Sequence, residues 1–587
     1  MFEYHRSAEH RPRRRPPRAH ANLVDLARCR AREQPQHKAF VFLREGEIET
    51  ESLTFAALDV GARAMAATLQ QHFRPGDRVL LSYPSGLEFI LAFFGCLYAG
   101  VLAVPVYPPT GSTEIGRLER IAADCGALGI CVARSGFDGT RVAIAGSPLL
   151  RSLTCITLPA LLDEPASAWA ESELHADSLA FLQYTSGSTG APKGVMVSHG
   201  NLLHNQRLIE TAFGLTERSV AVSWLPLYHD MGLVGHVLQT LYLGTTSVLM
   251  SPVAFIAKPA RWLQAISDHR ATSSGGPDFA YDLCVRRVTT QQMMALDLSC
   301  WKIAFSGAET VRHGTLARFA EKFAECGFRR SALTPCYGMA EATLFVAAGD
   351  KSRIPAVRRI DPGALQWHRV QHVAPNEANG LSIVSCGRAV GQEVAIVDPH
   401  TRRRCGHGQV GEIWVCGPSV AKGYWNNPRE SAATFEARLA DSDGGPYLRT
   451  GDMGFIDDGE LFVTGRVKDL IVISGRNYYP NDIEAAVRAS HPALEGGLAA
   501  AFSVELEGEE RLIVAHEIHR HVLRRLPRHE VTSAARTALM SQLGLPLQDL
   551  VLLEQGRLPK TSSGKIRRRA SREAYLGDAL VSRLRAA

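Results

Sequence analysis

The stretch LQYTSGSTGAPKGVMVSH, residues 182–199, joins two apolar runs through a loop of glycines, hydroxyl side chains and one lysine. Small residues let backbone N–H groups approach an anion, and hydroxyls and an ammonium add donors, so the loop predicts a phosphate site. Lys193 is followed by Gly194 and a strand-like run at 195–197, whereas a P-loop lysine opens a helix. The pattern excludes a P-loop NTPase. An ordinary Ser/Gly turn between two strands is the alternative.

Helical and strand-like segments alternate on both sides of this loop. We expect helices at 22–34 and 54–73, and strands at 39–43, 78–83, 179–184, 219–226, 246–251 and 302–308. Further strands at 393–398, 411–417 and 460–465 predict a small β-rich lobe, and residues 349–380 look like an insertion or long loop. The fold class is therefore α/β, and 587 residues predict three or four folding units.

A second apolar run, FILAFFGCLYAGVLAVPVY at 89–107, must be weighed as a membrane span because it carries no charge. Gly100 is a typical helix stop, and Pro105, Pro108 and Pro109 would interrupt a spanning helix. We expect a helix and then a buried strand, with no transmembrane segment.

The cysteines indicate the cellular compartment. The chain has 12 cysteines at irregular positions and no C-x-x-C pair. This pattern matches neither a disulfide framework nor a zinc site, so we predict a cytoplasmic protein without a structural metal.

Charge is concentrated at the two ends of the chain. Residues 1–20 hold six arginines and no apolar h-region, which predicts a disordered basic tail; a nucleic-acid or membrane-surface arm is the alternative. Residues 466–587 contain 19 Lys and Arg against 14 Asp and Glu, so this end is expected to face an acidic partner. The net charge of +6 argues neither for nor against nucleic acid on its own. No nucleic-acid partner is expected.

Four further motifs follow the opening loop, and each contains a residue suited to ATP chemistry. CYGMAEAT offers the carboxylate of Glu341 for Mg²⁺, and YLRTGDMGF offers Asp452 as an acceptor for a ribose diol. FVTGRVKDLI supplies Arg466 and Lys468, and LPKTSSGKIRR supplies Lys565 in a Gly/Ser loop. Each residue alone also fits an ordinary structural role, but the set together indicates a nucleotide-dependent enzyme.

The order of these motifs resembles the adenylate-forming superfamily of acyl and aryl ligases, and most closely the fatty acyl-AMP ligases. The resemblance to this branch rests on four stretches, AVPVYPP, GGPDFAYDLC, YGMAEATL and RNYYPNDIE. It also rests on the 41 residues between Thr343 and Ser385, a longer segment than we expect in an acyl-CoA ligase. The resemblance implies a large N-terminal domain of two α/β lobes plus a β-rich lobe, hinged to a small α+β domain. The implied bounds are tail 1–20, N-terminal domain 21–465 with a family-type insertion at 349–380, hinge 466–469 at Lys468, and mobile C-terminal domain 470–587.

The resemblance also assigns residues to ATP. The β- and γ-phosphates are expected to contact Thr185, Ser186, Ser188, Thr189 and Lys193. The adenine is expected beside Ala308, Glu309, Tyr337, Gly338 and Met339. The same resemblance implies that Asp452 and Arg466 hold the ribose and that Glu341 binds Mg²⁺.

The implied reaction joins a medium- or long-chain fatty acid to AMP with release of pyrophosphate. Lys565 is expected to reach the substrate carboxylate and the α-phosphate, and His229 to lie where the acyl chain enters; a buried, satisfied histidine is the alternative. The expected acceptor is the phosphopantetheine thiol of an acyl carrier protein. Candidate docking residues are Arg524, Arg525, Arg567, Arg568 and Arg569. An acyl-CoA synthetase and a non-catalytic adenylate-binding sensor are the rival interpretations.

Overall fold

The computed structural model describes most of the chain from residue 20 onward. The described ranges are 20–109, 111–133, 138–157, 166–185, 192–374, 377, 380–442, 444–506, 509–523, 527–561, 565–577 and 579–580. Residues 1–19 and three expected phosphate contacts, Ser186, Ser188 and Thr189, lie outside these ranges.

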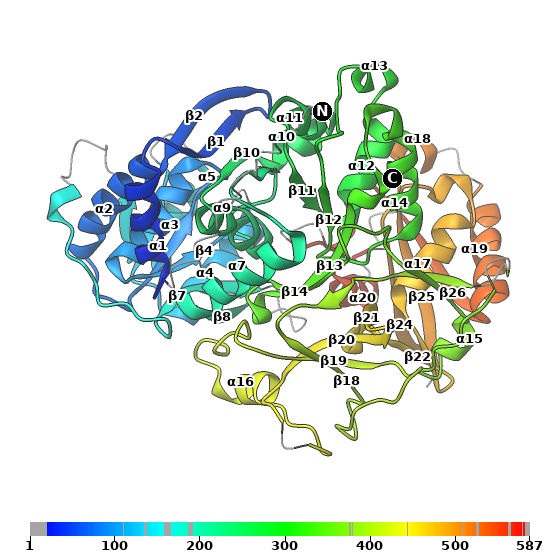
Figure 1. The fold of residues 1–587 in the computed structure, drawn as a ribbon. Coiled ribbons are helices and arrows are strands. Elements are labelled where there is room, and N and C mark those ends of the chain that lie inside the picture. Colours follow the sequence, from blue (N-terminus) through cyan, green and yellow to red (C-terminus); the bar gives the residue numbers. More distant parts are fainter. Residues whose placement is uncertain are drawn as a thin grey trace, which may run out of the picture.

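The first sheet contains the strands on either side of the opening loop (Figure 1). In spatial order they are β6 (Thr154–Thr157), β5 (Gly129–Val132), β3 (Arg78–Ser82), β4 (Leu102–Pro105), β7 (Leu179–Thr185) and β8 (Lys193–Ser198). The first five run parallel, and β8 returns antiparallel to β7. Every residue of β4 and β5 is buried, as in parallel sheets covered on both faces.

A nine-stranded sheet forms the second lobe. In spatial order its strands are β17 (Arg388–Ala389), β14 (Phe345–Ala348), β13 (Leu333–Gly338), β12 (Ile303–Ser306), β11 (Ser273–Gly276), β9 (Val220–Ser223), β10 (Thr246–Met250), β1 (Lys38–Arg44) and β2 (Ile48–Thr54). The strands from β13 to β1 run parallel, and the edge strands are antiparallel. All the strands expected in this part of the chain are therefore confirmed.

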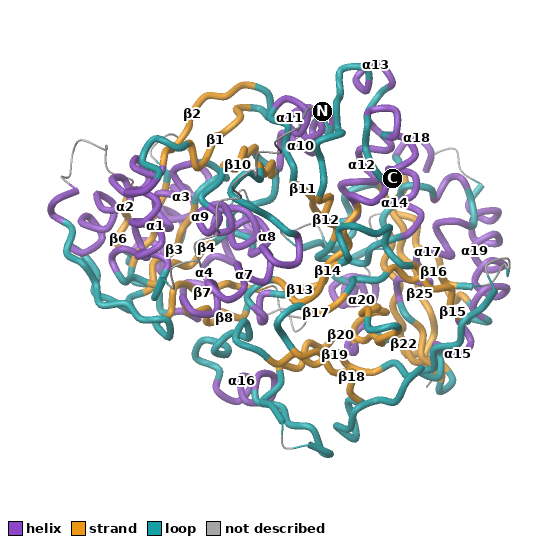
Figure 2. Tube along the Cα trace, in the orientation of Figure 1, coloured by secondary structure: helices purple, strands orange, loops and turns teal. Residues whose placement is uncertain are grey.

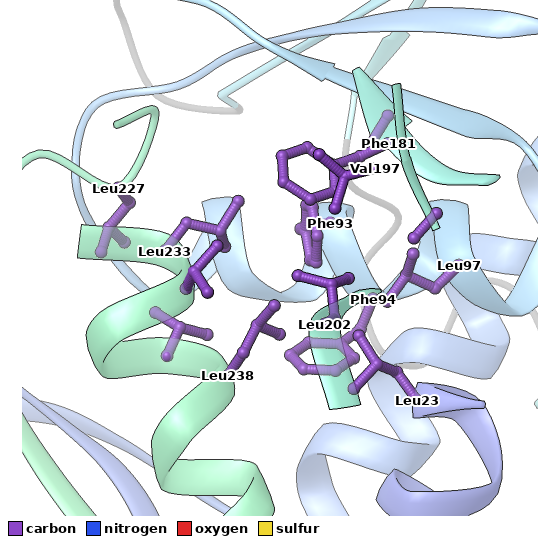
Figure 3. Packing of buried hydrophobic residues seen from close by; sticks show 14 of the residues in the cluster. Leu23, Phe93, Phe94, Leu97, Phe181, Val197, Leu202, Leu227, Leu233 and Leu238 are labelled. Carbon is purple, nitrogen blue, oxygen red and sulfur yellow. The ribbon is translucent and has the colours of Figure 1, made fainter. Parts of the chain in front are cut away.

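Helices pack on both sheets. They include α1 (Leu23–Glu33), α2 (Phe55–Gln70), α3 (Leu87–Ala99), α4 (Ser112–Cys125), α7 (His199–Phe213), α8 (Asp230–Gly232), the π-helix η2 (Leu233–Leu238), α9 (Gln239–Leu243), α11 (Ala260–Asp268), α12 (Asp278–Arg287) and α14 (His313–Lys322). Figure 3 shows Phe93 and Phe94 of α3 packed among leucines from α1, α7 and η2. This shared core joins elements of both lobes.

The apolar run at 89–107 forms a helix and then a strand, as expected. The helix α3 ends at Gly100, whose φ of +70° lies in the left-handed region that glycine adopts without a Cβ clash. The strand β4 follows at once and is buried in the first sheet. In the described part of the chain, no helix combines the length and the hydropathy that a membrane span requires.

The β-rich lobe is a four-stranded antiparallel sheet. Its strands lie in chain order: β18 (Glu393–Val397), β19 (Gly411–Cys416), β20 (Leu448–Asp457) and β21 (Glu460–Arg466). Figure 2 shows that this region is mainly strand and loop, unlike the helix-rich parts beside it.

The segment at 349–380 is more ordered than a long loop. It contains strand β15 (Val357–Ile360), which pairs with β16 (Leu381–Val384), and one helical turn, α15 (Pro362–Leu365). Ile360 and Leu365 join an apolar cluster with Phe455 and Phe462 of the β-rich lobe. The strand VRRI escaped prediction because its two central residues are arginines, which hide the usual apolar pattern.

After the 3₁₀ turn η6 (Val467–Asp469), the chain forms a smaller α+β unit with its own core. Its elements are β22 (Ile471–Ile473), β23 (Arg476–Tyr478), α17 (Pro480–Ala489), β24 (Ala499–Leu506), β25 (Glu509–Ile518), α18 (Arg520–Leu523), α19 (Arg528–Leu543), β26 (Leu547–Glu554) and α20 (Arg568–Leu576). Ile483 and Val487 of α17 pack with Val531 and Leu539 of α19.

Candidate active site

The opening loop joins β7 to β8, so its two ends are held side by side. Thr185 and Lys193 are partners in the antiparallel register. The Lys193 ammonium pairs with Glu430 and lies 4.9 Å from the centre of the Tyr424 ring. One cation–π contact and one carboxylate therefore fix this lysine at the loop's exit.

Glu341 lies in a 3₁₀ turn directly after β13 and faces the same tyrosine. The Tyr424 hydroxyl donates to Glu341 Oε1 over 2.9 Å. Burial raises the pKa of the Glu341 carboxyl, although the Tyr424 hydrogen bond and the Arg466 charge act in the opposite direction. Tyr424 thus links Lys193 to the expected metal ligand.

Asp452 and Arg466 face each other across β20 and β21. Arg466 Nε lies 2.9 Å from Asp452 Oδ1, and the Tyr337 hydroxyl donates to Asp452 Oδ2 over 2.8 Å. Asp452 is buried, and its charge raises the pKa of the Arg466 guanidinium. Two carboxylate oxygens held by two donors give a rigid acceptor of the kind expected for a ribose.

The residues expected around adenine lie in two tight turns. Ala308 has a φ of +67°, a left-handed conformation that is uncommon for a residue with a Cβ. The next residue, Glu309, accepts a hydrogen bond from the Phe279 backbone N–H over 2.8 Å. A Cβ on Gly338 would lie 1.8 Å from the Leu344 carbonyl oxygen, so only glycine fits there. Met339 continues this turn by donating its N–H to the same carbonyl.

His229 is partly exposed, and its ring pairs with the carboxylate of Asp230. Its Nδ1 lies 2.6 Å from Asp230 Oδ1, and the side chain is 27% exposed. Burial favours the neutral form of Asp230, but His229 and Lys565 together hold the pKa of this carboxyl below its ordinary value.

Lys565 belongs to the C-terminal unit, and its charge interacts with charged residues of the large domain. Burial and the Arg466 charge lower the pKa of its ammonium. Three carboxylates counteract that shift: Asp230, Glu309 and Asp452. The charge of Lys565 therefore acts together with those of Asp230, Glu309 and Asp452 on the large domain.

The remaining expected residue, Lys468, lies in the turn η6 directly after Arg466, and its charge acts on Glu430.

Three contact residues were not anticipated from the sequence. Asp230 follows His229 directly, so the sequence carried a signal for it. The sequence contained no signal for Tyr424 or Glu430. Glu430, for example, lies 237 positions along the chain from its partner Lys193. Their relation to the loop exists only in the folded chain.

Magnesium fits the site only together with nucleotide phosphates. Among the described residues, no three His, Cys, Asp or Glu side chains gather as a metal cage. Mg²⁺, however, is commonly held by one or two carboxylates plus substrate phosphates and water. The half-buried Glu341 carboxylate, which Tyr424 links to Lys193 at the exit of the loop, meets that requirement.

Comparisons with known proteins agree with this geometry. The model of the AMP-binding enzyme family matches residues 28–425. The chain is 46% identical to the medium-chain-fatty-acid–[acyl-carrier-protein] ligase of Moorena producens, covering 95% of each chain. It is 37% identical to the ligase of the same description from Teredinibacter turnerae, covering 94% of this chain and 93% of the other. It also resembles the fatty acyl-adenylate ligase of Legionella pneumophila, solved with acyl adenylate and pyrophosphate. That match has a TM-score of 0.75 at 41% identity and covers 94% and 96% of the two chains.

The chain therefore belongs to the AMP-binding enzymes, in the branch of the fatty acyl-AMP ligases. The adenylate-forming fold expected from the motifs, with a large N-terminal and a smaller C-terminal domain, is confirmed.

Proposed function

We propose that the chain uses ATP to convert a medium- or long-chain fatty acid to an acyl-adenylate, and then passes the acyl group to the phosphopantetheine thiol of an acyl carrier protein. The observation that carries the proposal is the buried Asp452 carboxylate, whose two oxygens are held by Arg466 and Tyr337 as an acceptor for a ribose. The charge of Lys565, from the small domain, acts on the same carboxylate. The relatives described as acyl-carrier-protein ligases support the choice of acceptor and of a medium chain.

In the first step a carboxylate oxygen of the fatty acid attacks the α-phosphorus of ATP. A new oxygen–phosphorus bond forms, and the bond to pyrophosphate breaks. Both reactants are anions, so positioning and charge neutralisation supply most of the catalysis. Lys565 is the group we assign to the fatty-acid carboxylate and the α-phosphate.

The other groups hold the nucleotide. Asp452, fixed by Arg466, accepts from the ribose hydroxyls, and Lys193 with Thr185 faces the outer phosphates. Mg²⁺ would be held by Glu341 and the phosphates, where it would supply positive charge to the leaving pyrophosphate. His229, oriented by Asp230, lies at the acyl entrance in this assignment.

The acceptor choice rests on contacts that tie the 349–380 segment to the small domain. Gln366 Nε2 donates to the Leu543 carbonyl over 3.1 Å. The Gln366 carbonyl accepts from both the backbone and the side chain of Asn477, over 3.2 and 3.0 Å. These bonds oppose rotation of the small domain, which thiol transfer needs. A productive carrier protein must supply docking energy that free CoA lacks.

The cellular site we propose is the cytoplasm. All 12 cysteines are free thiols, as is usual in a reducing compartment.

Two assays test the proposal. Fatty-acid-dependent exchange of labelled pyrophosphate into ATP should be present and should depend on Mg²⁺. Product analysis with CoA and a phosphopantetheinylated carrier protein, offered separately, should give the carrier thioester much faster. Transfer to CoA at the rate of adenylate formation would instead make the chain an acyl-CoA synthetase. Binding of acyl-adenylate without any exchange would make it a sensor.

A further inference from the structure

A chain of hydrogen bonds crosses from the adenine-side turn to the small domain. Asn481, near the start of α17, donates from Nδ2 to Thr310 Oγ1 over 2.8 Å. Its Oδ1 accepts from the Arg568 guanidinium over 2.6 Å. Arginine has donors only, so the Asn481 carbonyl must face Arg568 and its amide NH₂ must face Thr310.

Arg568 connects three elements of the small domain and hinge. Its Nε and Nη2 donate to the two oxygens of Glu484 over 2.7 and 2.9 Å, and its Nη1 donates to Asp469 over 3.2 Å. The side chains of Arg568 and Glu484 are 18% and 4% exposed. A bidentate, largely buried ion pair of this kind holds α17, α20 and the hinge turn as one unit.

The Lys565 backbone is fixed by Thr561 and lies close to Arg568 in the chain. Its backbone N–H donates to Thr561 Oγ1 over 3.0 Å, and its carbonyl accepts from the Thr561 N–H over 2.8 Å. Only two residues separate it from Arg568. The place of the Arg568 unit therefore determines the place of the Lys565 backbone.

Thr310 is equally constrained on the large domain. It follows Ala308, which has a positive φ, and Glu309, which is anchored to the N-terminus of α12 by the Phe279 N–H. The Thr310 hydroxyl is thus presented from the turn that flanks adenine.

We propose that Thr310 and Asn481 are positioning residues that seat Lys565 by latching the small domain to the adenine-side turn. The inference rests on the proposed adenylation reaction. The Arg568 unit lies within the small domain and hinge, so it moves with them. Rotation for thiol transfer must therefore break the Thr310–Asn481 bond and leave the Arg568 unit intact.

The first test compares Thr310→Val with Thr310→Ser. Valine keeps the shape of threonine but removes the hydroxyl, whereas serine keeps the hydroxyl. Losing one hydrogen bond should slow adenylate formation about three- to tenfold in Thr310→Val. Because the substitution displaces Lys565 and leaves the nucleotide contacts in place, kcat for adenylation should fall while the KM for ATP stays unchanged. Transfer from supplied acyl-adenylate should not fall, and Thr310→Ser should keep most of the adenylation rate.

A double-mutant cycle tests whether the two residues act together. Asn481→Ala should slow adenylation more than Thr310→Val does, because it also removes a partner of Arg568. The double variant should be no slower than Asn481→Ala alone, since both changes remove the same bond. Additive losses would mean that the two residues act separately, and would overturn the latch.

A measurement without substrate separates the latch from the proposed reaction. Amide hydrogen exchange at residues 308–312 and 466–469 should be faster in Thr310→Val than in Thr310→Ser. If the unmodified protein forms no acyl-adenylate, the proposed function fails, but this comparison still decides the latch. Identical exchange in the two variants, equal loss of both half-reactions, or a change confined to the KM for ATP would each overturn it.

Discussion

Two fully buried polar side chains show how differently single residues contribute to stability. Asn205 has its amide bonded to the Phe345 carbonyl and to Ser419, and its Oδ1 accepts from the Phe345 N–H. In contrast, neither ring nitrogen of His236 has a hydrogen-bond partner among the described residues. Burial lowers the pKa of His236 to about 4, so the ring is neutral at pH 7.

Replacing these two residues with leucine should therefore affect stability to different degrees. Asn205→Leu leaves buried backbone groups unpaired and should cost roughly 2–3 kcal/mol of unfolding free energy. His236→Leu removes an unpaired polar ring and should be within about 1 kcal/mol of the unmodified protein, or more stable. Urea-unfolding midpoints measure both changes.

The pH dependence of His236→Leu provides a second check. The unfolded histidine takes up a proton near its ordinary pKa of 6.5, whereas the folded one does so only near 4. The unfolded state thus binds more protons between these values, and the unmodified protein loses stability as pH falls through them. The leucine variant should lose less over the same window. An equal loss would contradict the neutral, buried state of His236.

Lys565 is the residue whose removal should separate the two half-reactions. Lys565→Ala should lose about 2–4 kcal/mol of transition-state stabilisation in adenylation, while transfer from supplied acyl-adenylate largely survives. The exposed Lys258, paired with Glu47 on the surface, provides a matched control, and Lys258→Ala should leave both rates unchanged. Equal losses in both half-reactions of Lys565→Ala would contradict its assignment.

The same lysine predicts an alkaline limit for adenylation. Its pKa is lowered from the ordinary 10.5 by burial and by Arg466, so it loses its proton at a lower pH than a free lysine does. The adenylation rate should therefore fall as pH rises toward that lowered value. The pH profile of pyrophosphate exchange measures this limit.

Among the structural elements, the 349–380 segment has the most direct bearing on the acceptor. Gln366, directly after the α15 turn, contacts two elements of the small domain: its side chain donates to the end of α19, and its backbone carbonyl accepts from Asn477 of β23. Burial of Gln366 protects these bonds from competition with water.

Gln366→Ala should loosen the small domain and raise transfer to free CoA. Losing the bond to Leu543 should increase that rate about two- to tenfold, with adenylation kept. Gln371→Ala, in the same segment but at an exposed position, is the control and should change neither rate. If Gln366→Ala leaves CoA as poor an acceptor as before, exclusion of the CoA nucleotide from the thiol channel is the better explanation.

For the whole molecule, the distribution of charge bears on the carrier protein. The last part of the chain holds 19 basic against 14 acidic residues. Arg568 does not belong to a docking surface, because its guanidinium is used inside the small domain; Arg524 and Arg525 lie outside the described residues. Arg567 and Arg569 stay candidates, and Arg569 is well exposed.

Transfer to an acidic carrier protein should consequently weaken with salt, while acyl-adenylate formation should not. Exposed charges are screened over about 8 Å at physiological ionic strength, so the second-order rate of transfer should fall as salt rises. Arg569→Glu should reduce both this rate and its salt dependence. If the rate of transfer changes neither with salt nor in Arg569→Glu, the basic residues form a solvated face and not a docking surface.

The sequence by itself determined the elements and the kind of chemistry. Local patterns suffice where one segment decides its own structure: Gly100 ends α3 because a left-handed φ favours glycine, and the apolar runs become buried strands. The phosphate-type loop and the motifs around Glu341, Asp452 and Lys565 indicated ATP chemistry because their residue types match what phosphate, metal and ribose require.

Only the tertiary structure decided which of these groups meet. Glu430 pairs with Lys193 although 237 positions separate them in the sequence, and Gln366 contacts Leu543 across 177 positions. The periodic patterns that predict helices and strands extend over a few residues, so they cannot predict such contacts. The arginine-rich strand β15 depends on its partner β16 and so escaped a local pattern. Lys565 enters the site only through the packing of one domain on another, and such packing depends on side chains that are brought together after each domain has folded.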